Sequence, residues 1–177
     1  MIRPICRLGN PILREICKKL TKQEVLSEGF AQLKQDLYDS MKHYGGIGIA
    51  APQIGVNLQV ALIDLAPVNR YGAEVSLSKT YFINPSIEVL SDSKEGNWEG
   101  CLSVPGMRGY VERPNHILVK YFDENFEEQS FEVKGFVAIV IQHELDHLYG
   151  KLYIDHIKDM SLLSFQEEYE AFILPQQ

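Results

Sequence analysis

The chain has 177 residues, of which 45% are apolar and 23% are charged, and such a composition is ordinary for one soluble globular domain over residues 1–177. Its formal charge of −7 argues against nucleic-acid binding, because phosphate requires a positive surface, and no apolar run is long enough to span a membrane. The three cysteines, Cys6, Cys17 and Cys101, are too few and too widely spaced for a disulfide framework, which favours a reducing cytosol.

The N-terminal part of the chain predicts one long helix. Residues 21–24 have the form of a capping box. Apolar residues then recur at helical spacing until Gly45 and Gly46, at Leu26, Phe30, Leu33, Leu37 and Met41. We expect a core-facing helix of about five turns. His43 near its end is interpreted as a charge partner of the helix C-terminus rather than as a metal ligand.

A glycine-rich segment over residues 45–55 follows this helix. It lacks the Lys-Ser/Thr pair of a phosphate loop, and it follows a helix instead of a strand, so nucleotide binding is not favoured. Two interpretations stay open. The small residues let the backbone approach a ligand or a neighbouring strand closely, with Gln53 as an amide donor beside it, or the segment is a plain turn from helix to strand.

The middle of the chain predicts short strands, mostly antiparallel. They cover residues 58–65, 81–90, 108–113, 117–122 and 131–133. Residues 67–80 are expected to form a loop, and residues 95–106 a turn-rich segment.

The segment 135–149 predicts a buried helix that carries a metal site. His143 and His147 are four residues apart and share one face, and Glu144 is placed to move a proton on water held by the same metal. The preceding run 136–141 is apolar almost all round, so the helix must be buried, and buried His and Glu side chains need a partner. Gly150 supplies the stop, and a final amphipathic helix is expected over residues 158–172.

The fold class that follows is α+β. Short, mostly antiparallel strands pack around a central buried metal-binding helix, with an N-terminal and a C-terminal helix. A catalytic metal of this kind needs three protein ligands and one open position. Three candidates offer the third ligand: Tyr153 at the position of a metzincin histidine, a glutamate of the tail (Glu167, Glu168 or Glu170), and the Cys101 thiolate. A phenol is a poor substitute for imidazole, and the tail glutamates suit a solvated helix face.

Three motifs together resemble those of the peptide deformylases. With Φ for a hydrophobic residue, the family motifs are Gly-Φ-Gly-Φ-Ala-Ala-x-Gln, Glu-Gly-Cys-Φ-Ser and Gln-His-Glu-Φ-Asp-His. They occur here in family order at residues 46–53, 99–103 and 142–147, and no motif position departs.

The resemblance implies a role for each motif residue. It implies that Cys101, His143 and His147 bind one divalent metal, natively Fe(II), with zinc, nickel or cobalt as alternatives in purified protein. Metal-held water loses its proton to Glu144, acting as general base and acid, and attacks a formyl carbon, while Gln53 and the N–H of Leu102 stabilise the oxyanion. The substrate peptide lies along Gly46, Ile47 and Gly48 as an added strand. The implied activity removes the N-formyl group from the N-terminal methionine of newly made polypeptides.

Further substrate contacts are predicted from the buried apolar run before the third motif and from two charged residues. Phe136, Ile139 and Val140, with Ile47, are expected to line a slot for a methionine side chain, and Glu99 is expected to pair with Arg108 at its rim. The expected partners are N-formylmethionyl peptides and nascent chains, with transient ribosome contact. The tail after Lys158 is acidic, which does not suit the basic helix that some deformylases present to the ribosome. The resemblance covers both bacterial and organellar proteins. A bacterial cytoplasm is expected, because the basic first twenty residues lack serine and contain Pro4 and Pro11, which weakens the alternative of an organellar transit peptide.

Overall fold

A computed structural model describes residues 1–70 and 73–176 and contains two antiparallel sheets. The larger sheet has the order β1-β2-β3-β6-β7, formed by β1 (Gly48–Ala50), β2 (Val60–Arg70), β3 (Ala73–Val89), β6 (His116–Phe122) and β7 (Glu128–Lys134). The smaller sheet has the order β4-β5-β8, formed by β4 (Lys94–Cys101), β5 (Val104–Pro114) and β8 (Leu163–Phe165). The predicted α+β class with antiparallel strands is confirmed.

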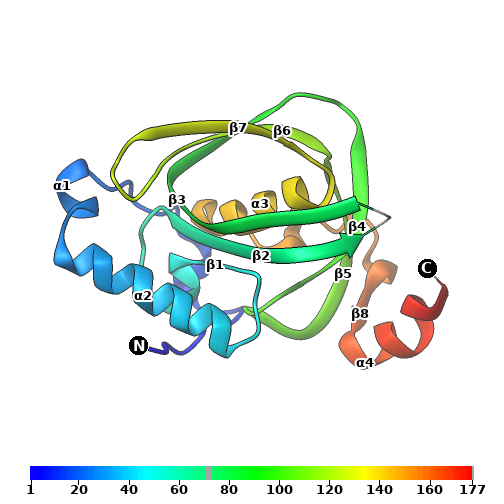
Figure 1. Ribbon diagram of the computed structural model, residues 1–177. Coiled ribbons are helices and arrows are strands. Elements are labelled where there is room, and N and C mark those ends of the chain that lie inside the picture. The colour runs from blue at the N-terminus through cyan, green and yellow to red at the C-terminus, as the bar shows by residue number, and fades with distance from the viewer. Residues whose placement is uncertain (71–72, 177) are drawn as a thin grey trace.

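A central helix, α3 (Gly135–Asp146), runs beneath the larger sheet (Figure 1). It continues as a 3-10 turn, His147–Tyr149, and ends at Gly150, whose φ of 71° favours glycine. This agrees with the helix predicted over residues 135–149. Its apolar side chains pack on β2, β3 and β6 in one core that includes Ala138, Ile141, Leu145, Ala61, Ile63, Phe82, Ile117 and Val119. Burial of this helix fixes where its histidines lie.

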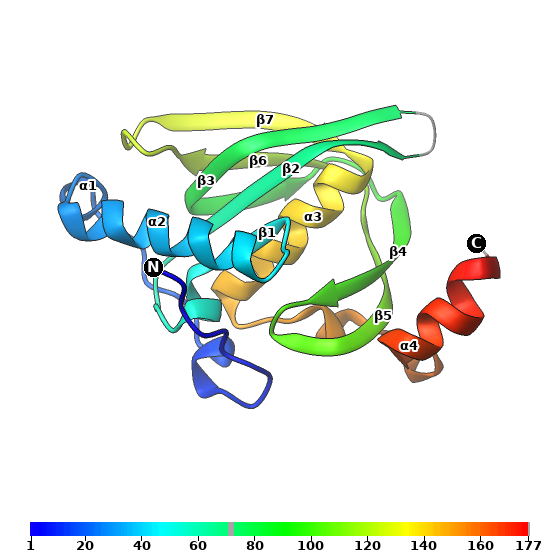
Figure 2. The same cartoon turned by 60° about the horizontal axis from the view of Figure 1, so that its bottom comes forward.

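The first half of strand β2, residues 60–65, is buried on both faces, because α2 (Glu28–His43) covers the side opposite α3 (Figure 2). Ala61 and Ile63 face α3, whereas Val60 and Leu62 join the core made by α2. This is the alternation that a pleated strand imposes. The α2 side chains in that core are Phe30, Leu33, Leu37 and Met41, as their helical spacing predicts.

The prediction of a single long N-terminal helix is wrong, because the structure has two helices there. The capping box at Thr21 starts only a short helix, α1 (Lys22–Val25), and a second helix begins at Glu28. The Ser27 side chain accepts a hydrogen bond from Phe30 N at 3.3 Å and so caps α2, which breaks the helix between the two. Leu26 falls at the break and is 59% exposed, although its spacing predicted a core position.

Two segments predicted as irregular form strands instead. In the expected loop over residues 67–80, β2 extends to Arg70 and β3 begins at Ala73, with Leu65 opposite Leu77; residues 71–72 lie outside the described residues. The turn-rich segment 95–106 is mostly the β4–β5 hairpin, and only residues 102–103 turn. Cross-strand pairing has overridden the weak strand propensity of these polar and glycine-rich stretches.

The predicted C-terminal helix over residues 158–172 is also wrong over its first half. Residues 163–165 form β8, which pairs with β5 and places Ser164 opposite Arg108. A 3-10 turn, Met160–Leu162, precedes this strand, and continuous helical structure begins at α4 (Gln166–Glu168) and continues through a π-helical segment, Tyr169–Ile173. This end of the chain projects from the body beside β4 and β5 in both views (Figure 1) (Figure 2). No helix in the described ranges is long and apolar enough to cross a membrane.

Candidate active site

Three potential metal ligands converge from separate parts of the chain. Cys101 ends β4, His143 lies in the last turns of α3, and His147 follows that helix. Their ligand atoms all lie within 4.8 Å of one another, and Cys101 Sγ is 3.4 Å from His147 Nε2. The sulfur is thus the third donor beside the two imidazoles. Glu167, Glu168 and Glu170 belong to the projecting C-terminal helix instead, and Tyr153 stacks its ring on His143 at 6.1 Å between ring centroids.

The donor set fits a divalent transition metal with one open position. Thiolate and imidazole are the ligands that such ions prefer, and three of them leave a fourth tetrahedral position free. Burial would raise the pKa of the Cys101 thiol, but the charges and hydrogen bonds of His147 and His143 hold this pKa well below its usual value. Burial would lower the pKa of His143, yet Cys101 and Glu99 raise it well above its usual value. The cluster therefore favours a thiolate at Cys101 and a positive charge on His143 beside it.

A buried ion network holds the His143 ring in place. Glu99 Oε2 lies 2.7 Å from His143 Nδ1, and the same carboxylate accepts from Arg113 Nε at 2.7 Å. Arg113 Nη1 donates to Asp146 Oδ2 at 2.7 Å. Burial would raise the pKa of the Glu99 carboxyl, but His143 and Arg113 hold this pKa below its usual value. With Nδ1 occupied by Glu99, the other ring nitrogen of His143 is left for the metal.

The expected pair between Glu99 and Arg108 is wrong. Glu99 is buried rather than at a rim, and its partners are Arg113 and His143. Arg108 Nε donates instead to Gln166 Oε1 at 2.6 Å. Sequence reasoning missed Arg113, although one signal was available: it alternates with Gly109 and Val111 along β5, so it falls on the buried face of that strand.

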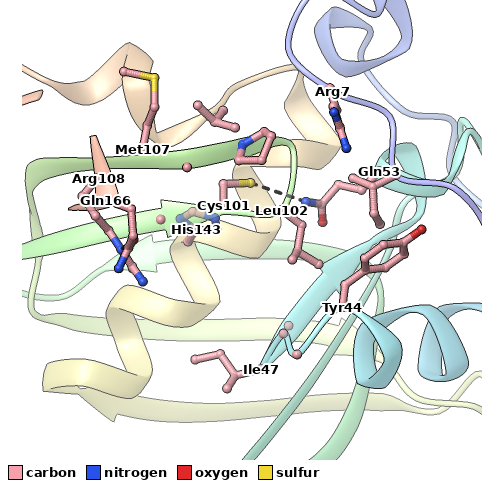
Figure 3. A pocket seen from close by; sticks show the side chains of 18 of the residues that line it. Arg7, Tyr44, Ile47, Gln53, Cys101, Leu102, Met107, Arg108, His143 and Gln166 are labelled. Atoms are coloured by element: carbon pink, nitrogen blue, oxygen red, sulfur yellow. Dashed lines mark hydrogen bonds between the residues drawn. The ribbon is translucent and has the colours of Figure 1, made fainter. Parts of the chain in front are cut away.

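Gln53 is fixed beside the Cys101 sulfur. It lies in the 3-10 turn Ala51–Ile54 after β1, and its Oε1 accepts from Ala50 N at 2.8 Å. Its Nε2 therefore points away from Ala50 and lies 3.2 Å from Ser103 Oγ and 3.5 Å from Cys101 Sγ. Figure 3 shows this amide directed at the sulfur, with Leu102 beside it. The buried Ser103 hydroxyl was not singled out from the sequence, although it belongs to the second motif.

Glu144 is a buried carboxyl with an unsatisfied oxygen. Its Oε2 finds no hydrogen-bond partner among the described residues. Burial raises the pKa of Glu144, against the lowering effect of His143 and His147. The carboxyl stands against the backbone of Gly48, where an added Cβ would lie 2.5 Å from Glu144 Oε1. Only glycine at position 48 leaves room for this carboxyl, which is suited to accept and return a proton.

Two cavities meet at this centre. The larger, about 550 Å³, is lined by most of the predicted site residues, namely Gly46, Ile47, Gly48, Gln53, Cys101, Leu102, Arg108, His143 and Glu144. The smaller, about 160 Å³, is lined by Phe136, Ile139 and Val140, with Ile47, Glu99 and Arg108. The structure therefore brings the predicted slot residues together next to Glu144. The larger cavity also takes in Ile5, Arg7, Tyr44, Met107 and Gln166, which the sequence did not indicate.

Comparisons with known proteins agree with this geometry. The model of the polypeptide deformylase family matches residues 2–162. A peptide deformylase of Leptospira biflexa is 43% identical over 171 residues, which cover 96% of each chain. A Met-Ala-Ser-bound class I type b peptide deformylase from Acinetobacter baumannii is 34% identical, with a TM-score of 0.83 over 89% of this chain and 99% of that one. An actinonin-bound peptide deformylase from Synechococcus elongatus is also 34% identical, with a TM-score of 0.80 over 96% of this chain and 85% of that one.

Proposed function

This chain belongs to the polypeptide deformylase family, and from that premise we propose that it removes the N-formyl group from the N-terminal methionine of newly made polypeptides. The observation that carries the proposal is the meeting of one sulfur and two imidazoles within 4.8 Å at the wall of a cleft. Family membership makes the chain a hydrolase, and the roles of single residues follow from the geometry around these donors.

The metal would be held by Cys101, His143 and His147. When bound, a divalent metal, which we expect to be Fe(II), with zinc, nickel or cobalt as alternatives, supplies a Lewis acid at the formyl group. Glu144 takes a proton from the attacking water and later returns it to the departing amine, since its carboxyl is the unsatisfied group beside the donors. Gln53 Nε2 and the backbone N–H of Leu102 donate to the oxygen on which negative charge develops.

The two cavities divide the substrate between them. The smaller cavity accepts the methionine side chain between Phe136, Ile139 and Val140, since these apolar side chains line it beside Glu144. The peptide backbone extends along the edge formed by Gly46, Ile47 and Gly48, as an added strand of the larger sheet. Because both sheets and α3 contribute residues, residues 1–177 act as one catalytic unit.

Substrates of this kind are nascent chains, so we place the protein in a bacterial cytoplasm with transient access to the ribosome. The acidic C-terminal segment, with Glu167, Glu168 and Glu170, offers no positive surface for RNA. Access to the ribosome would therefore not use this helix.

The test is release of formate from formyl-Met-Ala-Ser by protein purified without oxygen, together with a measurement of bound metal. We expect about one metal per chain and catalytic formate release that stops when a chelator removes the metal. A metallopeptidase with a tail glutamate as ligand would instead cleave internal peptide bonds and be indifferent to Cys101→Ser. Metal-loaded protein that releases no formate would refute the proposal.

A further inference from the structure

Two arginines at the cleft differ from the other arginines whose side chains the structure describes. Among arginines with described side chains, Arg3 pairs with Asp36, Arg14 with Asp155, and Arg113 with Glu99 and Asp146. Arg7 and Arg108 have no carboxylate partner within the described residues, and both line the larger cavity. The two arginines without a carboxylate partner therefore both lie where a peptide would lie.

Arg108 is held in a defined position without being neutralised. Its Nε donates to Gln166 Oε1 at 2.6 Å, and its guanidinium lies on the backbone of Gly100, where an added Cβ would be 2.6 Å from Nη1. The neutral amide of Gln166 fixes the side chain but leaves its charge uncompensated. Because Arg108 lines both cavities, its Nη groups lie at the junction between the methionine slot and the rest of the cleft.

The residue that holds Arg108 comes from the C-terminal segment. The family model ends at residue 162, and β8 follows directly after it. Pairing of β8 with β5 places Ser164 opposite Arg108, which brings Gln166 to the guanidinium. Figure 3 shows Arg108 and Gln166 together on one side of Cys101 and His143, with Arg7 on the other side. The cleft is therefore flanked by positive charge on two sides.

We propose that Arg108, positioned by Gln166, and Arg7 across the cleft make the enzyme selective for formylated peptides that carry a carboxylate side chain in the residues after the methionine. This inference rests on the proposed deformylase function. Apart from the two arginines and Tyr44, the ionisable groups that line the larger cavity, Cys101, His143 and Glu144, belong to the reacting centre. A cleft with fixed charges of one sign attracts the opposite sign, and the guanidinium fork suits a carboxylate.

The test compares peptides that differ by one charge at constant shape. C-terminally amidated formyl-Met-Ala-Asp and formyl-Met-Ala-Asn remove the terminal carboxylate as a competing anion, and formyl-Met-Asp-Ser and formyl-Met-Asn-Ser amides probe the preceding position. We expect kcat/KM to favour the Asp peptide over its Asn partner by about three- to fivefold in at least one pair, as for a partly exposed ion pair. The preference should shrink at high salt.

Single substitutions locate the source of the preference. Arg108→Gln and Arg7→Gln should each lower the Asp/Asn ratio toward one, mainly through KM of the Asp peptide. The matched control is Lys120→Gln, which removes one positive charge from the exposed side chain on β6 that pairs with Glu88. This control should keep the ratio. An equal loss in all three variants would mean that only net charge matters and would overturn the proposal.

Two variants at position 166 separate positioning from packing. Gln166→Leu removes the acceptor for Arg108 and should lower the Asp/Asn ratio while the far-ultraviolet circular dichroism spectrum is kept. Gln166→Glu retains an acceptor but neutralises Arg108, so it should leave the KM of the Asn peptide unchanged while abolishing the preference for Asp. If Gln166→Glu keeps the full preference, Gln166 does not act through the charge of Arg108.

Failure of this inference is distinguishable from failure of the proposed function. Absence of formate from every peptide would refute deformylation itself. Formate release from all four peptides with Asp/Asn ratios of one would leave deformylation in place and overturn charge selectivity.

Discussion

A buried carboxyl oxygen without a partner is the residue-scale feature on which the chemistry depends. Glu144 Oε2 is unsatisfied, and burial raises the pKa of this carboxyl. We predict that Glu144→Ala keeps the metal, since it supplies none of the three donors, but lowers kcat/KM by about 10²- to 10⁴-fold, the usual contribution of a general base. Formate release and metal analysis of the same preparation check this. Metal-replete Glu144→Ala protein with a near wild-type rate would remove Glu144 from the reaction.

Gly48 supplies a second prediction at this scale. A Cβ at this position would lie 2.5 Å from Glu144 Oε1 and 2.6 Å from its Cδ, so Gly48→Ala must displace this carboxyl. We expect a loss in kcat/KM of about 100-fold, as for a displacement near 1 Å at a reacting group, with metal content unchanged. The control is Gly29→Ala in α2, whose added Cβ would meet only Ser27 Oγ at 3.7 Å. Equal activity of both variants would contradict the crowding at Gly48.

Among single residues, those that act within a short motif could be predicted, and those that act across strands could not. His143, Glu144 and His147 share one helix face, so their spacing alone brings them together. The partner of Glu99 depends on the register of β4 against β5 and on how α3 lies across them, and the sequence contains neither. For that reason Arg108 was predicted as the partner of Glu99, whereas the partner in the structure is Arg113. The contact of Gln166 with Arg108 could not be predicted, because β8, which places Gln166 beside Arg108, was predicted as helix.

At the scale of elements, the ion network of Arg113 joins β4, β5 and α3. Arg113 is 3% exposed and pairs with two carboxylates, Glu99 and Asp146. We predict that Arg113→Met lowers the free energy of unfolding by about 3–5 kcal/mol, because the buried Glu99 would lose its guanidinium and keep only His143, and the partly buried Asp146 would keep only His156. Urea denaturation of metal-depleted protein measures this. The control is Lys158→Met, which breaks an exposed pair with Glu112 and should cost about 1 kcal/mol or less. Similar losses in the two variants would mean that burial does not set the strength of this network.

The same scale explains which elements the sequence predicted well. Helix α3 was found because its apolar run and its terminal glycine are local signals. The extended β2–β3 hairpin and β8 were not, since strands with polar residues exist only through their neighbours. The break before α2 carried a local signal, the cap residue Ser27, which was overlooked because the apolar spacing continues across it.

At the scale of the whole molecule, the site is assembled by two sheets on either side of α3, whereas the C-terminal segment is added at one edge. The family model matches only to residue 162, and the following residues pair with β5 through β8. Their aromatic contact with the body joins Tyr169 to Trp98, with 5.1 Å between ring centroids. None of the three metal donors, nor Glu144 or Gln53, belongs to this segment.

Truncation after Leu162 tests this arrangement. The shortened chain should fold and bind metal as the full chain does, since α3 and both cores remain. Loss of a three-residue strand pairing and one aromatic contact should cost about 1–3 kcal/mol of stability. Loss of Gln166 should also free Arg108 and reduce the Asp/Asn preference as Gln166→Leu does. Circular dichroism, metal analysis and kinetics with the amidated peptides measure these three effects. Truncated protein that fails to fold, or that keeps the full preference for Asp, would show that the segment is not an added wall of the cleft.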